Sequence, residues 1–205
     1  MVEARDPYAV ALGALRRMAG EGRFQWGEAV VVKVVAAELQ LSTTPVREAL
    51  ACMSGLGLIE HRRGHGYFYP SLTAADIIDL YDVEWTYVHG ALTLHHRGAA
   101  SLQEAVAALG SRTSLRLLFA AIVDHTGNEA LSARHAGIVE QLSSPERTRL
   151  ALEEDPDEAV ARMTRAVALG DRDLLLELVV VHHRQRCGRA GEITRLLRRE
   201  GGRRI

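Results

Sequence analysis

The sequence predicts a mostly α-helical protein in which three helices and a β-hairpin precede an all-helical antiparallel bundle. Three observations lead to this fold class. Apolar residues recur at helical spacing through most of the chain, a glycine-containing turn near residue 65 separates two short strand-like runs, and little strand pattern follows residue 73. The chain has 205 residues, which is enough for two domains, and we expect them at residues 1–70 and 71–205.

The first domain begins with three predicted helices. We expect the first at Tyr8–Met18, the second at Lys33–Leu39, and the third from Pro45 to Gly55 or Gly57. Hydroxyl side chains directly before Pro45 suit the start of the third helix, because they can cap its free amides and proline fits the first turn.

A predicted hairpin follows the third helix. The runs Leu58–His61 and Tyr67–Tyr69 flank the turn Arg-Arg-Gly-His-Gly at 62–66, and a new helix opens near Thr73. Three helices followed by a hairpin is the element order of a winged helix-turn-helix, whose third helix enters the DNA major groove. The residues expected to contact DNA are Lys33, Ser42, Thr43, Thr44, Pro45, Arg47, Arg62, Arg63, His65 and Gly66.

Overall composition adds little to this prediction. The net charge is −1, so DNA binding depends on where the cations lie and not on their number. Two cysteines without metal-ligand spacing and the lack of a long apolar stretch predict a cytoplasmic protein without a membrane partner. Nucleophile-elbow, His-Glu-x-x-His, phosphate-loop and Cys-x-x-Cys motifs are all missing, which argues against an enzyme.

The N-terminal motifs resemble the GntR family of bacterial regulators over roughly residues 10–70. The resemblance rests on Thr44-Pro-Val-Arg-Glu-Ala-Leu50, on Gly57-Leu-Ile-Glu60 and on the Gly64-His-Gly66 turn. It implies a homodimer on a near-palindromic operator in double-stranded DNA. The family usually has Arg where Thr43 stands, and this loss of a long cation implies altered base or phosphate contacts.

The helical remainder resembles the FadR-like effector domain, known as FCD, through Gly127-Asn128 and Gly170-Asp171. That domain commonly holds a divalent metal with one Asp and three His side chains. The corresponding positions here are Leu115, Phe119, Val160 and His182, of which only the last has a lone pair to offer. We therefore expect neither the family's metal nor another cofactor.

The resemblance also suggests a pocket for a small-molecule effector, lined by Tyr81, Trp85, His89, Phe119 and His182. Two alternatives remain open: a protein-interaction module, and a constitutive regulator that has lost its sensing pocket. The sequence does not distinguish a repressor from an activator. His89 and His96 are seven residues apart, which leaves a relocated metal or haem site open, although solvated histidines are the simpler interpretation. The arginine-rich stretch 184–204 is interpreted as a solvated or frayed end.

Overall fold

The computed structural model describes residues 6–94, 101–152 and 156–202, which form two compact units. The first unit comprises residues 1–73 together with 194–205, and the second comprises residues 74–193. The sequence analysis assigned the whole of 71–205 to the second domain. The difference arises because the last helix runs from Arg172 to Gly202 and continues past the end of the bundle unit at Ile193.

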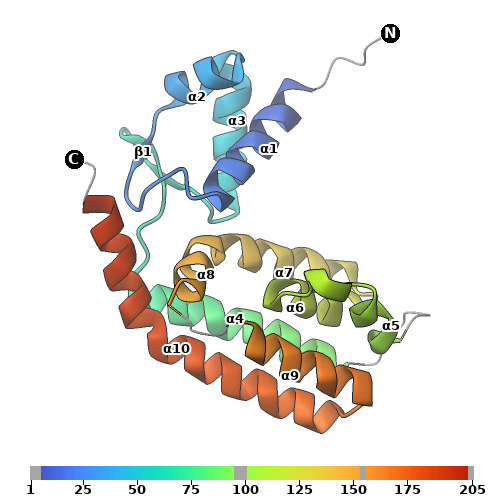
Figure 1. The fold of residues 1–205 in the computed structure, drawn as a ribbon. Helices are drawn as coiled ribbons and strands as arrows, with labels where there is room; N and C mark the ends of the chain where they lie inside the picture. The colour runs from blue at the N-terminus through green and yellow to red at the C-terminus, as the bar shows by residue number, and fades with distance from the viewer. Residues whose placement is uncertain (1–5, 95–100, 153–155, 203–205) are drawn as a thin grey trace. The chain divides into compact units, whose positions relative to one another are not determined.

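The first unit has the predicted order of elements (Figure 1). Its helices are α1 (Pro7–Gly20), α2 (Val32–Leu39) and α3 (Thr43–Gly55). Apolar side chains of α1 and α3, among them Leu15, Val46 and Leu50, are fully buried in one core. Because their spacing of three to four residues places them on one face of each helix, the opposite face of α3 stays open to solvent.

The predicted hairpin is part of a three-stranded antiparallel sheet with the order β1-β3-β2. Strands β2 (Glu60–Arg62) and β3 (Gly66–Phe68) form the hairpin, and β1 (Ala29–Val30) pairs with the other edge of β3. Strand β1 and its pairing with β3 were not predicted from the sequence. A strand of two residues carries too little periodicity to be assigned, and its partner lies far along the chain.

The second unit is a bundle of helices. They are α4 (Ala74–Thr93), α5 (Leu102–Ala107), the 3₁₀ turn η1 (Gly110–Arg112), α6 (Leu115–Asp124), α7 (Glu129–Gln141), α8 (Ser143–Leu150), α9 (Pro156–Leu169) and the first two thirds of α10 (Arg172–Gly202). Helices α5 and α8 were not predicted, because six- and eight-residue helices show few turns of periodicity.

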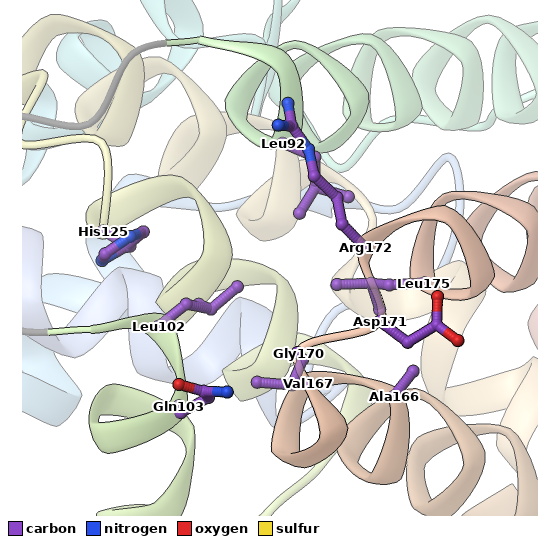
Figure 2. A pocket seen from close by; sticks show the side chains of 10 residues that line it. All are labelled: Leu92, Leu102, Gln103, His125, Ala166, Val167, Gly170, Asp171, Arg172 and Leu175. Carbon is purple, nitrogen blue, oxygen red and sulfur yellow. The ribbon is translucent and has the colours of Figure 1, made fainter.

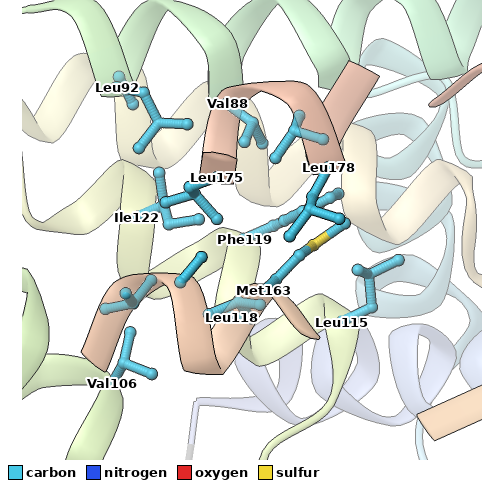
Figure 3. Packing of buried hydrophobic residues seen from close by; sticks show 14 of the residues in the cluster. Val88, Leu92, Val106, Leu115, Leu118, Phe119, Ile122, Met163, Leu175 and Leu178 are labelled. Atoms are coloured by element: carbon cyan, nitrogen blue, oxygen red, sulfur yellow. The ribbon is translucent and has the colours of Figure 1, made fainter. Parts of the chain in front are cut away.

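The bundle core contains the apolar side chains of α4, α6, α9 and α10 (Figure 3). Leu118, Ile122 and Met163 are at most 1% exposed at its centre. Leu115, Phe119 and Val160, which stand at the FadR-like ligand positions, belong to this same core. These positions therefore contribute to packing in this chain. No helix among the described residues is both long and apolar enough to cross a membrane.

Candidate nucleic-acid interface

The turn between α2 and α3 directs the third helix. Gln40 ends α2 in the left-handed conformation with φ 55°, and it is the only non-glycine residue in that region within the described chain. Its amide and that of Leu41 bond back to the carbonyls of Ala37 and Ala36, at 3.2 and 2.9 Å. This pattern closes the end of α2 and lets the chain reverse within three residues before α3 begins at Thr43.

The exposed start of α3 carries most of the residues predicted to contact bases. Ser42 is the N-cap residue, and its hydroxyl makes no capping bond, so that hydroxyl is open to another partner. Thr44 and Arg47 are exposed and lie three residues apart, hence on one face of the helix, while Thr43 is half-buried. No ion pair is described for Arg47 within the resolved ranges of the chain, which leaves its guanidinium available to guanine or phosphate.

Pro45 differs from its neighbours because its side chain is buried. Its predicted contact with DNA stays a prediction; in the structure, proline in the third helical position packs inward beside Val46 and supports the helix start. Lys33, in the first turn of α2, is exposed as a cation that can reach a phosphate.

The hairpin turn is held by its backbone. Gly64 and Gly66 have φ values of 76° and 97°, a conformation that side chains disfavour, and the His65 amide bonds the Arg62 carbonyl at 2.9 Å. His65 Nδ1 lies 3.0 Å from the Arg63 carbonyl, and both side chains are exposed. The ring of His61 stacks on Tyr67 across the two strands at 4.7 Å between centroids. The wing thus presents Arg63 and His65 on a defined turn.

Arg62 is engaged within the wing itself. Its Nε and Nη2 donate to the Glu60 carboxylate at 3.0 and 2.8 Å, and its guanidinium lies 4.2 Å from the centre of the Phe68 ring. The hydrogen bond and charge of Arg62 lower the pKa of Glu60, and Glu60 in turn raises the pKa of Arg62. Among the predicted wing cations, Arg62 is therefore neutralised by a neighbour. This pairing was not predicted, although residues 60 and 62 necessarily share one face of a strand.

Residues 1–73 contain eight basic and seven acidic side chains, so this segment is almost neutral. Because this segment has almost no net charge, the predicted DNA contacts of Lys33, Arg47 and Arg63 depend on their places at helix starts and the wing tip. An exposed recognition helix preceded by a bracing helix and followed by a hairpin wing defines the class of winged helix-turn-helix DNA-binding proteins.

Within that class, residues 7–68 match the family model described as bacterial regulatory proteins, gntR family. The chain therefore carries a GntR-family DNA-binding domain, which agrees with the resemblance seen in the sequence. The match supports a DNA-binding transcription regulator and not an enzyme. No curated protein sequence matches the chain.

Solved structures share the two-part fold. McbR/YncC from E. coli superposes with a TM-score of 0.66 at 17% identity, over 91% of this chain and 98% of the other. A GntR transcriptional regulator from Rhodococcus sp. RHA1 gives 0.69 at 16% identity, over 89% and 96%. Lar, which controls expression of the Listeria monocytogenes agr system, gives 0.53 at 13% identity, over 93% and 99%. At these identities the likeness concerns the fold.

Of the five residues predicted to line an effector pocket, three are buried side chains of the bundle. Tyr81, Phe119 and His182 are buried, and the rings of Phe119 and His182 meet edge-on at 6.4 Å. Trp85 and His89 form a separate pair at 5.0 Å. Burial, with Arg186 and Arg149 nearby, lowers the pKa of His182 to about 3, so its ring is neutral at physiological pH.

A cavity of about 250 Å³ lies elsewhere in the bundle, near the start of α10 (Figure 2). Its lining is Leu92, Leu102, Gln103, His125, Ala166, Val167, Gly170, Asp171, Arg172 and Leu175. Most of these residues are apolar, and the charged ones are Asp171 and Arg172, both exposed. None of the five predicted pocket residues lines it. This site was missed because its walls come from five separate segments of the chain.

Proposed function

We propose that the chain is a homodimeric transcription regulator that binds a near-palindromic operator through α3. The observation that carries the proposal is the exposed start of α3, where Thr44 and Arg47 are open to solvent while Val46 and Leu50 are buried. A single helix start reads only a few base pairs, so a specific operator needs two copies of the chain related by two-fold symmetry.

Selection of genomic fragments on the purified full chain tests this proposal. Retained fragments should share a palindrome whose half-sites lie about one helical turn apart or less. Light scattering of the isolated complex should give two chains per operator. Failure to enrich any sequence at low and at moderate salt, or one chain per operator, would contradict it.

We further propose that the bundle unit responds to a small molecule bound in the cavity near Arg172. The lining of the cavity is mainly apolar and includes the cation Arg172 beside the carboxylate Asp171, and the cation suits a small molecule with an apolar body and one anionic group. The cavity's volume of about 250 Å³ is slightly below the range typical of ligand pockets, about 300–1,000 Å³. A ligand that binds one dimer geometry more tightly shifts the population that is competent to bind DNA.

A panel of short- and medium-chain carboxylates, scored by thermal shift, tests this second step. Binding should disappear in Arg172→Gln, whose exposed side chain can change without disturbing the core, and should persist in Arg184→Gln, an equally exposed arginine on the same helix. Equal responses from both variants would contradict the site.

A constitutive regulator is the second candidate. Leu115, Phe119 and Val160 fill the FadR-like ligand positions with packed apolar side chains, and this observation favours loss of the family's metal and its ligand. Operator affinity that stays constant across the whole panel would support the constitutive form over ligand control.

A further inference from the structure

Three side chains with metal-ligating atoms meet between α4 and α10, away from the FadR-like positions. Asp82 lies on α4, and His183 and Cys187 lie one turn apart on α10. His183 Nε2 is 3.1 Å from Asp82 Oδ1, and Cys187 Sγ is 3.8 Å from either ring nitrogen of His183. One ligand atom from each of the three residues lies within 4.8 Å of the other two.

These separations suit a tetrahedral metal ion. Bonds of roughly 2.0–2.3 Å to zinc place neighbouring ligand atoms about 3.3–3.7 Å apart. The observed 3.1 and 3.8 Å lie within a few tenths of an ångström of that range, and the third separation, between Asp82 and Cys187, is at most 4.8 Å, so rotation of the exposed Asp82 side chain toward the thiol would complete the geometry. We propose that Asp82, His183 and Cys187 form a binding site for a divalent transition metal such as Zn²⁺, Co²⁺ or Ni²⁺, with a water or an external ligand in the fourth position.

The ligand types favour this class of ion. A thiolate and an imidazole select zinc-like metals over Mg²⁺ or Ca²⁺, which prefer oxygen ligands. Asp82 and the Cys187 thiolate together balance the charge of a divalent ion. Binding releases the thiol proton to solvent, as thiol ligands to metals require.

The surrounding structure holds the ligands and leaves them accessible. The Trp85 ring stacks on His183 at 5.4 Å between centroids with an angle of 26° between planes, which fixes the imidazole against α4. The Asp82 side chain is 57% exposed, so an ion can enter from solvent, while His183 is 17% exposed and partly shielded. Both helices are regular at these positions, and a site on rigid helices needs little reorganisation.

The site is separate from the family's metal positions. His182, which occupies one of them, packs against Phe119 in the core, whereas the next residue, His183, turns toward Asp82. Successive residues of a helix point about 100° apart, which explains how adjacent histidines serve different surroundings. The proposal does not depend on DNA binding or on an effector.

Titration of the chelator-treated full chain with Co²⁺ tests the site directly. We expect one Co²⁺ per chain, with visible d–d bands of tetrahedral geometry and a near-ultraviolet thiolate-to-cobalt charge-transfer band. Cys187→Ser should abolish the charge-transfer band, and Asp82→Asn or His183→Gln should weaken binding at least about tenfold. Cys52→Ser, which changes the chain's other cysteine, should bind as the parent does.

Replacement ligands separate coordination from a structural effect. Cys187→His should still bind Co²⁺, and bound Co²⁺ should raise the melting temperature of this variant. The charge-transfer band should be missing, because imidazole replaces the thiolate. Co²⁺ should also quench Trp85 fluorescence in a Trp26→Phe background, since that ring contacts a ligand. The proposal is overturned if no charge-transfer band forms, if the band survives in Cys187→Ser, or if Cys187→His fails to bind while retaining the far-ultraviolet spectrum of the parent.

Discussion

Arg186 and Glu84 form a buried ion pair that joins α10 to α4 across 102 residues of sequence. Their side chains are 4% and 6% exposed, and the Arg186 guanidinium also lies 4.0 Å from the centre of the Tyr81 ring. Glu146 of α8 accepts from Arg186 Nη2 at 2.9 Å and from Arg149 Nε at 3.0 Å. Two arginines and two glutamates thus neutralise one another and connect three helices. The sequence analysis was wrong to treat the whole stretch from 184 as a solvated end.

Removing one partner of this pair should strongly destabilise the bundle. Arg186→Met leaves the Glu84 carboxylate buried without its cation, and we expect a loss of about 3–5 kcal/mol in the free energy of unfolding. Urea unfolding followed through Trp85, in a Trp26→Phe background, measures it. The double variant Arg186→Met/Glu84→Met restores charge balance and should recover most of the loss. If Arg186→Met lowers the free energy of unfolding by less than about 1 kcal/mol, the buried ion pair does not stabilise the bundle as proposed.

Acid should weaken the same network through Glu146. Burial would raise the pKa of this carboxyl, but the charges of Arg186 and Arg149 outweigh it and lower the pKa to about 2. A lowered pKa stabilises the folded state above the ordinary value of 4.5, and this stabilisation is lost as pH falls toward 2. Between pH 5 and 3 the parent should lose about 2 kcal/mol more than Glu146→Gln does. Parallel curves for the two proteins in urea unfolding at each pH would refute this.

Arg47 should carry sequence-specific affinity. Its exposed guanidinium on the α3 face with Thr44 suits bidentate pairing with guanine, so Arg47→Ala should cost about 1–3 kcal/mol on the selected operator and relax specificity at one position. Arg17→Ala removes the same charge from an exposed site on α1 and is the control. Fluorescence anisotropy on matched and mutated operators measures both. If the two variants lose the same affinity for every DNA sequence, Arg47 contributes only its positive charge and does not recognise a base.

Glu60→Gln should strengthen DNA binding by the wing. The substitution releases Arg62 from a carboxylate that now holds it at 2.8 Å, and it removes a negative charge from the strand. We expect higher affinity for all sequences and a salt dependence steeper by about one counterion. Glu38→Gln, which frees Arg23 from a similar pair at 2.8 Å outside the wing, is the control. Anisotropy titrations over a range of salt concentrations measure the DNA affinity of both variants. The prediction is wrong if Glu60→Gln and Glu38→Gln change the affinity and its salt dependence by the same amount.

Gln40→Gly should stabilise the first unit. Gln40 has φ 55°, where a side chain costs about 1 kcal/mol and glycine costs nothing. Thermal unfolding followed through Trp26 in a Trp85→Phe background should show a gain of up to about 1 kcal/mol. Gln40→Val, which adds a β-branched side chain at the same position, should destabilise the unit. A Gly variant less stable than the parent would show that the Gln40 side chain contributes more than its strain.

Local pattern determined much of the first unit. The apolar spacing in α1 and α3, the hydroxyl-proline start of α3 and the glycines of the wing each act over a few residues. The three helices and the two hairpin strands were predicted with boundaries within about two residues. The strand Ala29–Val30, with only two residues, and the inward position of Pro45 were not. Both depend on partners in the folded unit: β3 for the strand and the α3 core for the proline.

In the bundle, the sequence determined that the segment is helical and that apolar residues replace metal ligands at Leu115, Phe119 and Val160. Only the tertiary structure decided which polar groups meet. Glu84 and Arg186, like Asp82 and Cys187, are about one hundred residues apart, and no local periodicity reports such a distance. The four-residue spacing of His183 and Cys187 was visible, yet it became a candidate site only when packing brought Asp82 beside it.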